Sequence, residues 1–457
     1  MQPGMGEAER HRAMPDGAPF SSREPSFGET MRLWWRIGCL SFGGPAAQIA
    51  LMHRAVVEEK RWVGEARFLH ALNFCMLLPG PEAQQLATYL GWLMHGVRGG
   101  LVAGLFFILP GVAVMLALSF LYAGFGQVPL VAALFFGLQC AVLALVVEAL
   151  VKVARRALHG ALAWVLALAA FLALFALQLP FPLVVLAAAL VGFAAPAALQ
   201  RATAAGGPAE TPALIDRLLA AEPGRPQRLA AGARRAGLVA LALWLWPVAL
   251  LHGSGLFGDI AWFFARMAVV TFGGAYAVLA YVAQEAVEKF GWLSAPAMLA
   301  GLGLAETTPG PLILVLQFVG FMAGWPQGGW TALAAALLTL WVTFAPCFAW
   351  IFLGAPFIER LQAQPRLRGA LAGVTAAVVG VIANLALWFA IRLLFQERAT
   401  TLFGPLRLEL PVLSSLDVAA LVLALLAAIG LFRLRLGIAT LLGLAALAGL
   451  ALRGIGL

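Results

Sequence analysis

The stretch GGLVAGLFFILPGVAVMLALSFLYAGFGQVPLVAALFFGLQCAVLALVV, residues 99–147, decides the fold class because it contains no Asp, Glu, Lys or Arg. The stretches 157–200, 236–258 and 307–358 are equally free of these residues. A helix needs roughly 20 apolar residues to cross the hydrocarbon of a bilayer, so each stretch predicts one or two crossings. Only 11% of the 457 residues are charged, against about a quarter in a soluble domain. We therefore predict an all-α polytopic membrane protein with roughly 12–14 membrane segments.

The positive charges lie between the apolar stretches. The net charge is +9, and Lys152, Arg155, Arg156, Arg433 and Arg435 are typical of its placement. This distribution indicates cytoplasmic loops of a membrane protein rather than a basic patch that would bind nucleic acid. We expect a multi-pass inner-membrane protein without a nucleic-acid partner.

The chain contains two copies of one unit. A constant shift of 230 aligns residues 36–81 with 266–311 without a gap. The alignment superimposes an FGG triplet, a PGP triplet, an Arg, a Glu and a Trp, which apolar composition alone does not explain. Each unit is predicted to hold two helices broken by Gly or Pro, followed by two uninterrupted spans and two trailing spans.

The predicted division of the chain has five parts. These are 1–29 as a disordered cytoplasmic tail, 30–200 as the first unit with its trailing spans, 201–235 as a flexible cytoplasmic linker, 236–255 as an extra span, and 256–457 as the second unit with its trailing spans.

The extra span predicts that the units are inverted. One crossing separates the cytoplasmic linker from the second unit, so the second unit begins outside. The first unit begins inside if it crosses the membrane an even number of times. Inverted-topology repeats with Gly/Pro-broken helices at matching positions indicate the binding site of a secondary transporter. Whether the broken segments span the membrane or re-enter it is open at this point.

The breaks favour an anion as substrate. A helix broken inside the membrane leaves backbone groups without partners, and its N-terminal end carries a positive partial charge and free N–H donors. Four such ends could converge from two opposed units. The candidate substrate-binding residues are Arg36, Ser41, Phe42, Gly43, Gly44, Pro79, Gly80, Pro81, Gln84, Arg266, Thr271, Phe272, Gly273, Gly274, Thr307, Thr308, Pro309, Gly310 and Pro311.

These candidates have structural alternatives. Arg36 and Arg266 could bind an oxyanion through two parallel N–H hydrogen bonds. Alternatively, their side chains could only snorkel, which places the guanidinium group at the membrane surface. The hydroxyls could donate to an anion or to the preceding helical turn, and the triplets could be packing contacts or kinks. Glu82 and Glu306, which flank the PGP triplets, are candidate proton carriers or partners of Arg, because an acid in the membrane is costly.

Enzyme patterns are absent from the sequence. It has no GxxxxGK[ST] phosphate loop and no HExxH, and no GxSxG in a strand–helix context. The four cysteines lie in apolar segments without a CxxC, so we expect no disulfide, metal or cofactor. A membrane enzyme acting on anionic lipids would need a nucleophile or base beside the breaks, and none recurs in both copies. A scaffold role would leave the repeated breaks unexplained.

Four strings resemble a known family. SFGGPAAQI (41–49) and RFLHALNFCMLLPGPEAQQLAT (67–88) are similar to the N-terminal half of chromate ion transporters, and TFGGAY (271–276) and LAETTPGP (304–311) to the C-terminal half. The resemblance covers residues 30–395 and is to the long two-domain form. It implies chromate efflux from the bacterial cytoplasm and chromate resistance.

The expected mechanism is alternating access driven by the membrane potential. Moving one charge through 100 mV is worth about 2.3 kcal/mol, so a dianion leaving a negative interior gains about 4.6 kcal/mol, and efflux needs no coupled ion. Proton coupling stays open, as does uptake or exchange of sulfate or a related oxyanion, since sulfate is also a tetrahedral dianion. The expected partners are the anion and lipid, with a homodimer left open.

Overall fold

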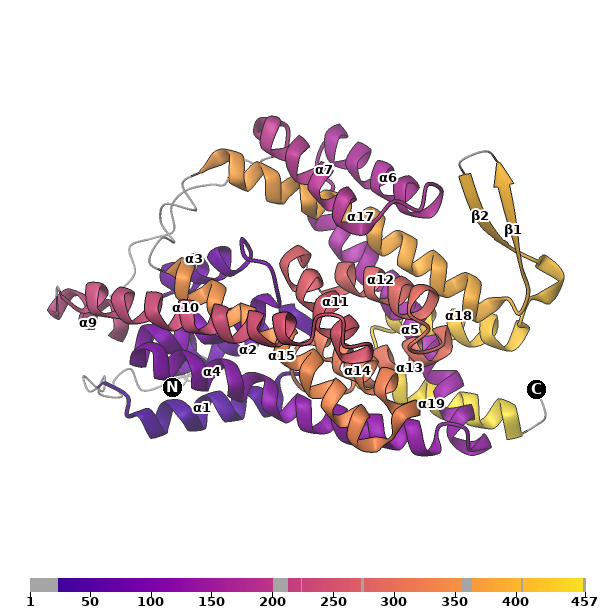
Figure 1. Ribbon diagram of the computed structural model, residues 1–457, viewed down its shortest axis with the longest axis horizontal. Helices are drawn as coiled ribbons and strands as arrows, with labels where there is room; N and C mark the ends of the chain where they lie inside the picture. The colour runs from indigo at the N-terminus through magenta and orange to yellow at the C-terminus, as the bar shows by residue number, and fades with distance from the viewer. Residues whose placement is uncertain are drawn as a thin grey trace, which may run out of the picture.

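The computed structural model describes residues 24–199, 213–222, 224–272, 275–355, 364–403 and 406–454. Most of these residues are helical, and the long helices run along the longest axis of the molecule (Figure 1). Among the described residues, five helices are long and apolar enough to cross a membrane. They are Glu82–Phe125 (α4), Pro129–Ala157 (α5), Arg225–Leu250 (α10, from Gln227), Gly329–Gly354 (α15) and Pro365–Leu394 (α17). The predicted all-α polytopic membrane class is confirmed.

The first unit opens with two broken helices. Its elements before α4 are α1 (Phe27–Leu40), α2 (Gly44–His53), the π-helix η1 (Arg54–Glu59) and α3 (Glu65–Cys75). Helix α1 begins inside the predicted tail, because Ser26 and Glu29 form a capping box that satisfies its first N–H groups. Residues 1–23 of that tail lie outside the described residues.

The second unit repeats this order. Its elements are α11 (Leu256–Val270), α12 (Ala275–Gln284), the π-helix η2 (Glu285–Lys289), α13 (Ala295–Glu306), the 3₁₀ turn η3 (Leu312–Leu314), α14 (Val315–Gly324) and the 3₁₀ turn η4 (Trp325–Gln327). Hydrogen bonds recur at the shift of 230: the N–H of Trp62 donates to Val56 O and that of Trp292 to Ala286 O, both at 2.8 Å. The alignment of the two sequences is thus also an alignment of backbone hydrogen bonds.

Helix α4 folds back on itself within the first unit. His95 and Gly96 have non-helical backbone angles and divide its 44 residues into two parts. The two parts then pack so closely that a Cβ on Gly91 would lie 2.4 Å from Gly99 O. Only the second part is a long apolar span, because the first returns from the PGP break to the kink.

The helix pairs of the first unit enter and leave at one end of the molecule, here called the α9 end after helix α9 (Leu214–Ala221). Phe27, at the start of α1, packs on His95, and Trp62, between η1 and α3, accepts a bond from Ile215 N. The Arg225 guanidinium donates to Met94 O there. Both pairs, α1–α2 and α3 with the first part of α4, are therefore re-entrant, with their breaks deep in the molecule.

The helix pairs of the second unit enter and leave at the opposite end, where an antiparallel hairpin of β1 (Arg398–Phe403) and β2 (Leu406–Pro411) lies (Figure 1). Glu288 of η2 pairs there with Arg392 at the end of α17. Trp325 of η4 packs on Phe120 near the end of α4. We call this the β-hairpin end. The two units thus run in opposite directions along the molecule.

Short helices follow each unit. They are α6 (Ala161–Phe175), α7 (Phe181–Ala194), α8 (Pro196–Leu199), α18 (Val418–Phe432) and α19 (Ile438–Gly454), with the 3₁₀ turn η6 (Leu413–Ser415) before α18. Glycines let these helices approach their neighbours: a Cβ on Gly380 of α17 would lie 2.0 Å from Ala167 O of α6. Such small-residue contacts are typical of helix packing in membranes.

The predicted flexible linker is partly helical. Its described part contains α9 and the first eleven residues of α10, which starts at Arg225 rather than at 236. The helix continues because Arg225 is held by Glu24 at 2.5 Å and by Met94 O at 3.0 Å, a tertiary contact that composition did not reveal. Residues 200–212 of the linker lie outside the described residues.

Candidate functional site: a pocket where four helix breaks meet

The described breaks all contain glycine with a left-handed backbone. Gly43 (φ 87°) and Gly44 (φ 78°) separate α1 from α2, Gly80 (φ 121°) precedes α4, and Gly310 (φ 95°) stands at the position equivalent to Gly80. L side chains rarely adopt these angles, so the triplets are conformational requirements. The equivalent Gly273 and Gly274 lie outside the described residues.

The breaks of the two units bind each other reciprocally. The Gly80 N–H donates to the Thr271 carbonyl at 2.9 Å, and the Gly310 N–H donates to the Ser41 carbonyl at 2.8 Å. These bonds are equivalent under the shift of 230. Each PGP break therefore satisfies a carbonyl that the FGG break of the other unit leaves without a helical partner.

A long helix of the opposite unit supports each PGP break. Gly111 of α4 lies so close to the second triplet that a Cβ there would meet Pro309 O at 2.0 Å. Cys347 of α15 occupies the matching place against Gly80, where a Cβ would lie 2.8 Å from its Sγ. The breaks are thus enclosed by protein, which is how irregular backbone is tolerated at membrane depth.

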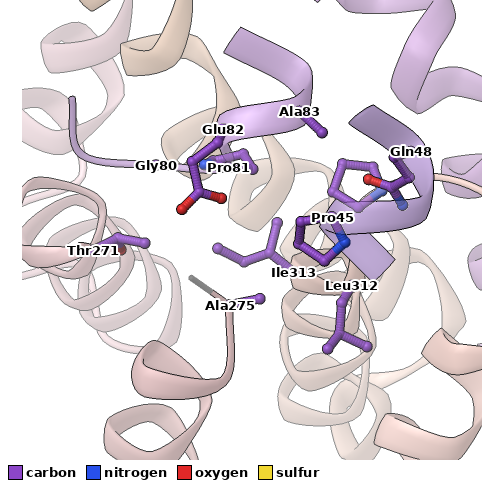
Figure 2. A pocket seen from close by; sticks show the side chains of 11 residues that line it. Pro45, Gln48, Gly80, Pro81, Glu82, Ala83, Thr271, Ala275, Leu312 and Ile313 are labelled. Carbon is purple, nitrogen blue, oxygen red and sulfur yellow. The ribbon is translucent and has the colours of Figure 1, made fainter. Parts of the chain in front are cut away.

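One pocket is lined by residues that lie in or beside each of the four breaks. The central pocket is lined by Pro45, Gln48, Gly80, Pro81, Glu82, Ala83, Thr271, Ala275, Pro311, Leu312 and Ile313. Figure 2 shows the side chains of both units facing each other across it. Its freely accessible space is only about that of one water molecule, so the pocket is narrow in the described conformation.

The predicted hydroxyl donors are committed to the backbone. Ser41 and Thr271 donate to the carbonyl four residues earlier, at 2.5 and 2.7 Å. Thr307 and Thr308 both donate to the Leu304 carbonyl, at 2.8 and 2.7 Å. Their protons are therefore not available to an anion, and the backbone alternative holds for these four side chains.

The two candidate acids differ in setting. Glu82 stands in the first turn of α4 and lines the central pocket. Glu306 is buried at the end of α13 and accepts a hydrogen bond from the Tyr276 hydroxyl. Glu306 lies beside a break without lining the pocket, so only Glu82 faces the space where a substrate could sit.

The two candidate arginines lie away from the pocket. Arg36 and Arg266 are both exposed on their helices, and the Arg266 guanidinium lies over the exposed Trp262 ring, 5.8 Å from its centroid. Neither residue is among those that line the central pocket. In this conformation they match the alternative in which an arginine extends along the outer face of a membrane helix.

The remaining candidates fall into two groups. Gly80, Pro81, Thr271 and Pro311 line the central pocket. The candidates that lie in the breaks or beside them without lining it are Ser41, Phe42, Gly43, Gly44, Pro79, Gln84, Phe272, Thr307, Thr308, Pro309 and Gly310.

Gln48 was missed by the sequence analysis. Its side chain is 1% exposed, and its Nε2 donates to Gly310 O at 2.6 Å and to Ser41 O at 3.3 Å, which joins the two units beside the pocket. Its Oε1 has no partner. An uncharged amide on the otherwise apolar helix α2 was the available signal, but its partner is 262 positions away.

No group of three or more His, Cys, Asp or Glu side chains suited to a metal occurs within the described ranges. The four cysteines are free thiols.

Comparison with known proteins identifies the family. The family model described as chromate transporter matches residues 28–193 and 258–450. The chain belongs to the chromate transporter family. The two matched regions leave out α8, α9 and the whole of α10, which connect the units. The family assignment and the apolar helices together make it a multi-pass membrane protein.

Named relatives cover most of the chain. The chromate transport protein of Pseudomonas aeruginosa is 34% identical over 368 residues, which are 78% of this chain and 79% of that protein. The probable chromate transport protein of Synechococcus elongatus is 29% identical, over 76% of this chain and 81% of that protein. The chromate transport protein of Cupriavidus metallidurans is 28% identical, over 78% and 81%. No solved structure matches the chain significantly.

Proposed function

We propose that this protein exports chromate from the cytoplasm across the bacterial inner membrane by alternating access of its two units around the central pocket. The observation that carries the proposal is the convergence of four helix breaks, two from each unit, on one pocket. Membership of the chromate transporter family supports chromate as the substrate, because the relatives named above are chromate transport proteins.

The first turn of α4 provides the anion site. Its N–H groups at Glu82, Ala83 and Gln84 precede the first helical bond, which Gln85 N makes to Pro81 O at 3.1 Å. Free N–H groups and the helix dipole favour an anion at such an end. The site therefore uses backbone donors and needs neither the hydroxyls nor the two arginines.

The reciprocal bonds supply the moving contact. The pocket is too narrow for an oxyanion in the described conformation, so we expect the units to shift relative to each other when a substrate enters. The Gly80–Thr271 and Gly310–Ser41 bonds connect the units at this point. The units run in opposite directions, so loosening one of these two bonds would open the pocket toward one end of the molecule. Loosening the other bond would open the pocket toward the opposite end.

The membrane potential drives export. A dianion leaving a negative interior gains about 4.6 kcal/mol at 100 mV, equivalent to more than three decades of concentration. Uptake of the same ion would need several coupled cations. Glu82 offers the route by which a proton could join the cycle.

The test is timed uptake of radiolabelled chromate into everted inner-membrane vesicles, with and without an imposed potential. Vesicles with the protein should accumulate chromate, faster when the lumen is positive, and control vesicles should not. A rate indifferent to the potential would contradict the driving force. Labelled sulfate, offered in place of chromate, tests the alternative of a sulfate carrier. Such a carrier would move labelled sulfate at least as well as chromate.

A further inference from the structure

Glu82 is the single charged residue among the described residues that line the central pocket. Figure 2 shows its carboxylate pointing away from α4, toward Thr271 and Ala275 of the second unit. The side chain thus projects into the space where the proposed function places a tetrahedral dianion.

No cation acts on this carboxylate in the described part of the chain. The titratable groups facing it from neighbouring elements are the Cys75 thiol of α3 and, against Gly80, the Cys347 thiol of α15. The residues that face it from α11, α12 and η3 are uncharged. Glu82 therefore places a negative charge in the pocket beside the N-terminal end of α4, with no cation against it.

The second unit lacks this feature. The shift of 230 places Leu312 opposite Glu82, so the other PGP break presents an apolar side chain to the same pocket. A symmetric packing role would call for similar residues at both positions. The asymmetry indicates that one unit supplies a charge with a role in binding.

A carboxylate and a dianion cannot share a pocket this small. Like charges at contact distance repel strongly outside bulk water. A nearby anion therefore favours the protonated, neutral form of a carboxyl group. The dianion can bind at the α4 donors once Glu82 has become neutral.

We propose that the Glu82 carboxylate is a tethered competitor for the substrate site, and that Glu82 takes up one proton from the entry side before each dianion binds. The proton then leaves with the anion on the other side, and the Glu82 carboxylate returns to the empty site. The cycle moves one net negative charge per oxyanion instead of two. This inference rests on the proposed function and assigns the coupling ion and the residue that carries it.

The test is the potential at which chromate flux stops in proteoliposomes. With a tenfold chromate gradient and equal pH, wild-type flux should vanish near ~60 mV if one charge moves, and near ~30 mV if two charges move. A pH difference of one unit should shift the wild-type value by a further ~60 mV. Glu82→Gln should stop near ~30 mV and ignore the pH difference.

Two further variants complete the test. Glu82→Leu copies the residue found at the equivalent position of the second unit, and replaces Glu82→Gln if that variant does not accumulate. Glu306→Gln is the matched control, because it neutralises a buried acid that does not line the pocket, and it should behave as wild type.

Each other outcome contradicts a distinct statement. A wild-type value near ~30 mV, unaffected by pH, overturns the inference and leaves chromate export standing. If flux stops near ~60 mV in both neutral Glu82 variants, the proton travels on the anion itself. Glu82 is then not the proton carrier. Loss of coupling in Glu306→Gln alone would assign the proton to Glu306. Absence of chromate flux in the wild type overturns the proposed function and this inference with it.

Discussion

At the scale of single residues, backbone geometry matters more than side-chain chemistry around the pocket. Gly80 combines a left-handed backbone with a bond across the two units, and there is no room for a Cβ between Cys347 and Gln85. Gly44 is left-handed too, but a Cβ there would meet nothing within 4 Å. Gly80 is therefore limited by space and conformation, and Gly44 by conformation alone.

Gly80→Ala should reduce chromate flux per inserted protein by at least about tenfold, because a φ of 121° strains an L residue in the turn that binds Thr271, and the added Cβ would also displace the Cys347 and Gln85 side chains. Gly443→Ala in α19 is the matched control: its Cβ meets nothing within 4 Å, so flux should not change. The measurement is vesicle flux divided by the amount of protein in the membrane. Normal flux in Gly80→Ala would show that the reciprocal bond is dispensable.

Gly44→Leu should insert normally and lose transport, since a side chain at a left-handed position beside the break strains the turn and fills the open space in front of it. Gly44→Ala fills less of that space and should retain more flux. Equal flux in the Leu variant and the wild type would make this break a packing contact only.

Arg36→Gln and Arg266→Gln should keep normalised flux within about twofold of wild type, as exposed positions outside a site usually do. The controls are Arg36→Lys and Arg266→Lys, which preserve the charge at the helix surface. These variants should match wild type in protein abundance as well as in flux. A large drop in normalised flux in either Gln variant would place that arginine in the transport path and reverse the present assignment.

At the scale of elements, the outer tips of the re-entrant pairs are held by ion pairs. Arg392 of α17 is 8% exposed, and its guanidinium bonds Glu288 of η2 at 2.5 Å and Glu409 of β2 at 3.1 Å. It also lies over the Trp388 ring, 4.1 Å from its centroid. Through this one side chain, the tip of the second unit is tied to a span and to the β-hairpin.

Arg392→Met should destabilise the protein by about 1–3 kcal/mol, because it leaves two carboxylates without their charged donor; the partial exposure of both acids limits the cost. Lys289→Met is the matched control, since it removes an exposed pair with Glu285 that contributes less than about 0.5 kcal/mol. Thermal unfolding in detergent compares them. Equal midpoints would show that the β-hairpin end is held by apolar packing instead.

At the scale of the whole molecule, the two units form one site because they run in opposite directions. Their tips lie at opposite ends, and their breaks meet between them (Figure 1). The Arg-rich start of α10 and the first turn of α17, with Arg366 and Arg368, lie toward the α9 end. By the positive-inside rule, we expect that end to face the cytoplasm.

Single cysteines at the equivalent positions Glu59 and Lys289 should therefore be labelled from opposite sides of the membrane. Both residues are exposed at the tips of their units. The background would carry Ser or Ala at Cys39, Cys75, Cys140 and Cys347. A membrane-impermeant maleimide is applied to intact cells and to everted vesicles, and the measurement is which of the two cysteines it labels in each. Labelling of both positions from the same side would contradict the inverted topology.

The sequence by itself determined the membrane class, the repeat and the positions of the breaks. Hydropathy over some 20 residues and the conformational limits of Gly and Pro are local properties, and the register of the repeat needs no contacts. The sequence did not indicate the β-hairpin or the helical part of the linker. Arg36 and Arg266 were grouped with the breaks because they are close to the FGG triplets in sequence.

Only the tertiary structure decided that the broken segments are re-entrant, that each PGP binds the FGG break of the other unit, and that Glu82 rather than Glu306 faces the pocket. These facts depend on pairs far apart in the chain, such as Gln48 and Gly310, which are 262 positions apart. The local pattern around such residues is the same whether or not they meet. Which backbone groups find partners, and which acid stays without a cation, is settled by the packing of the two units.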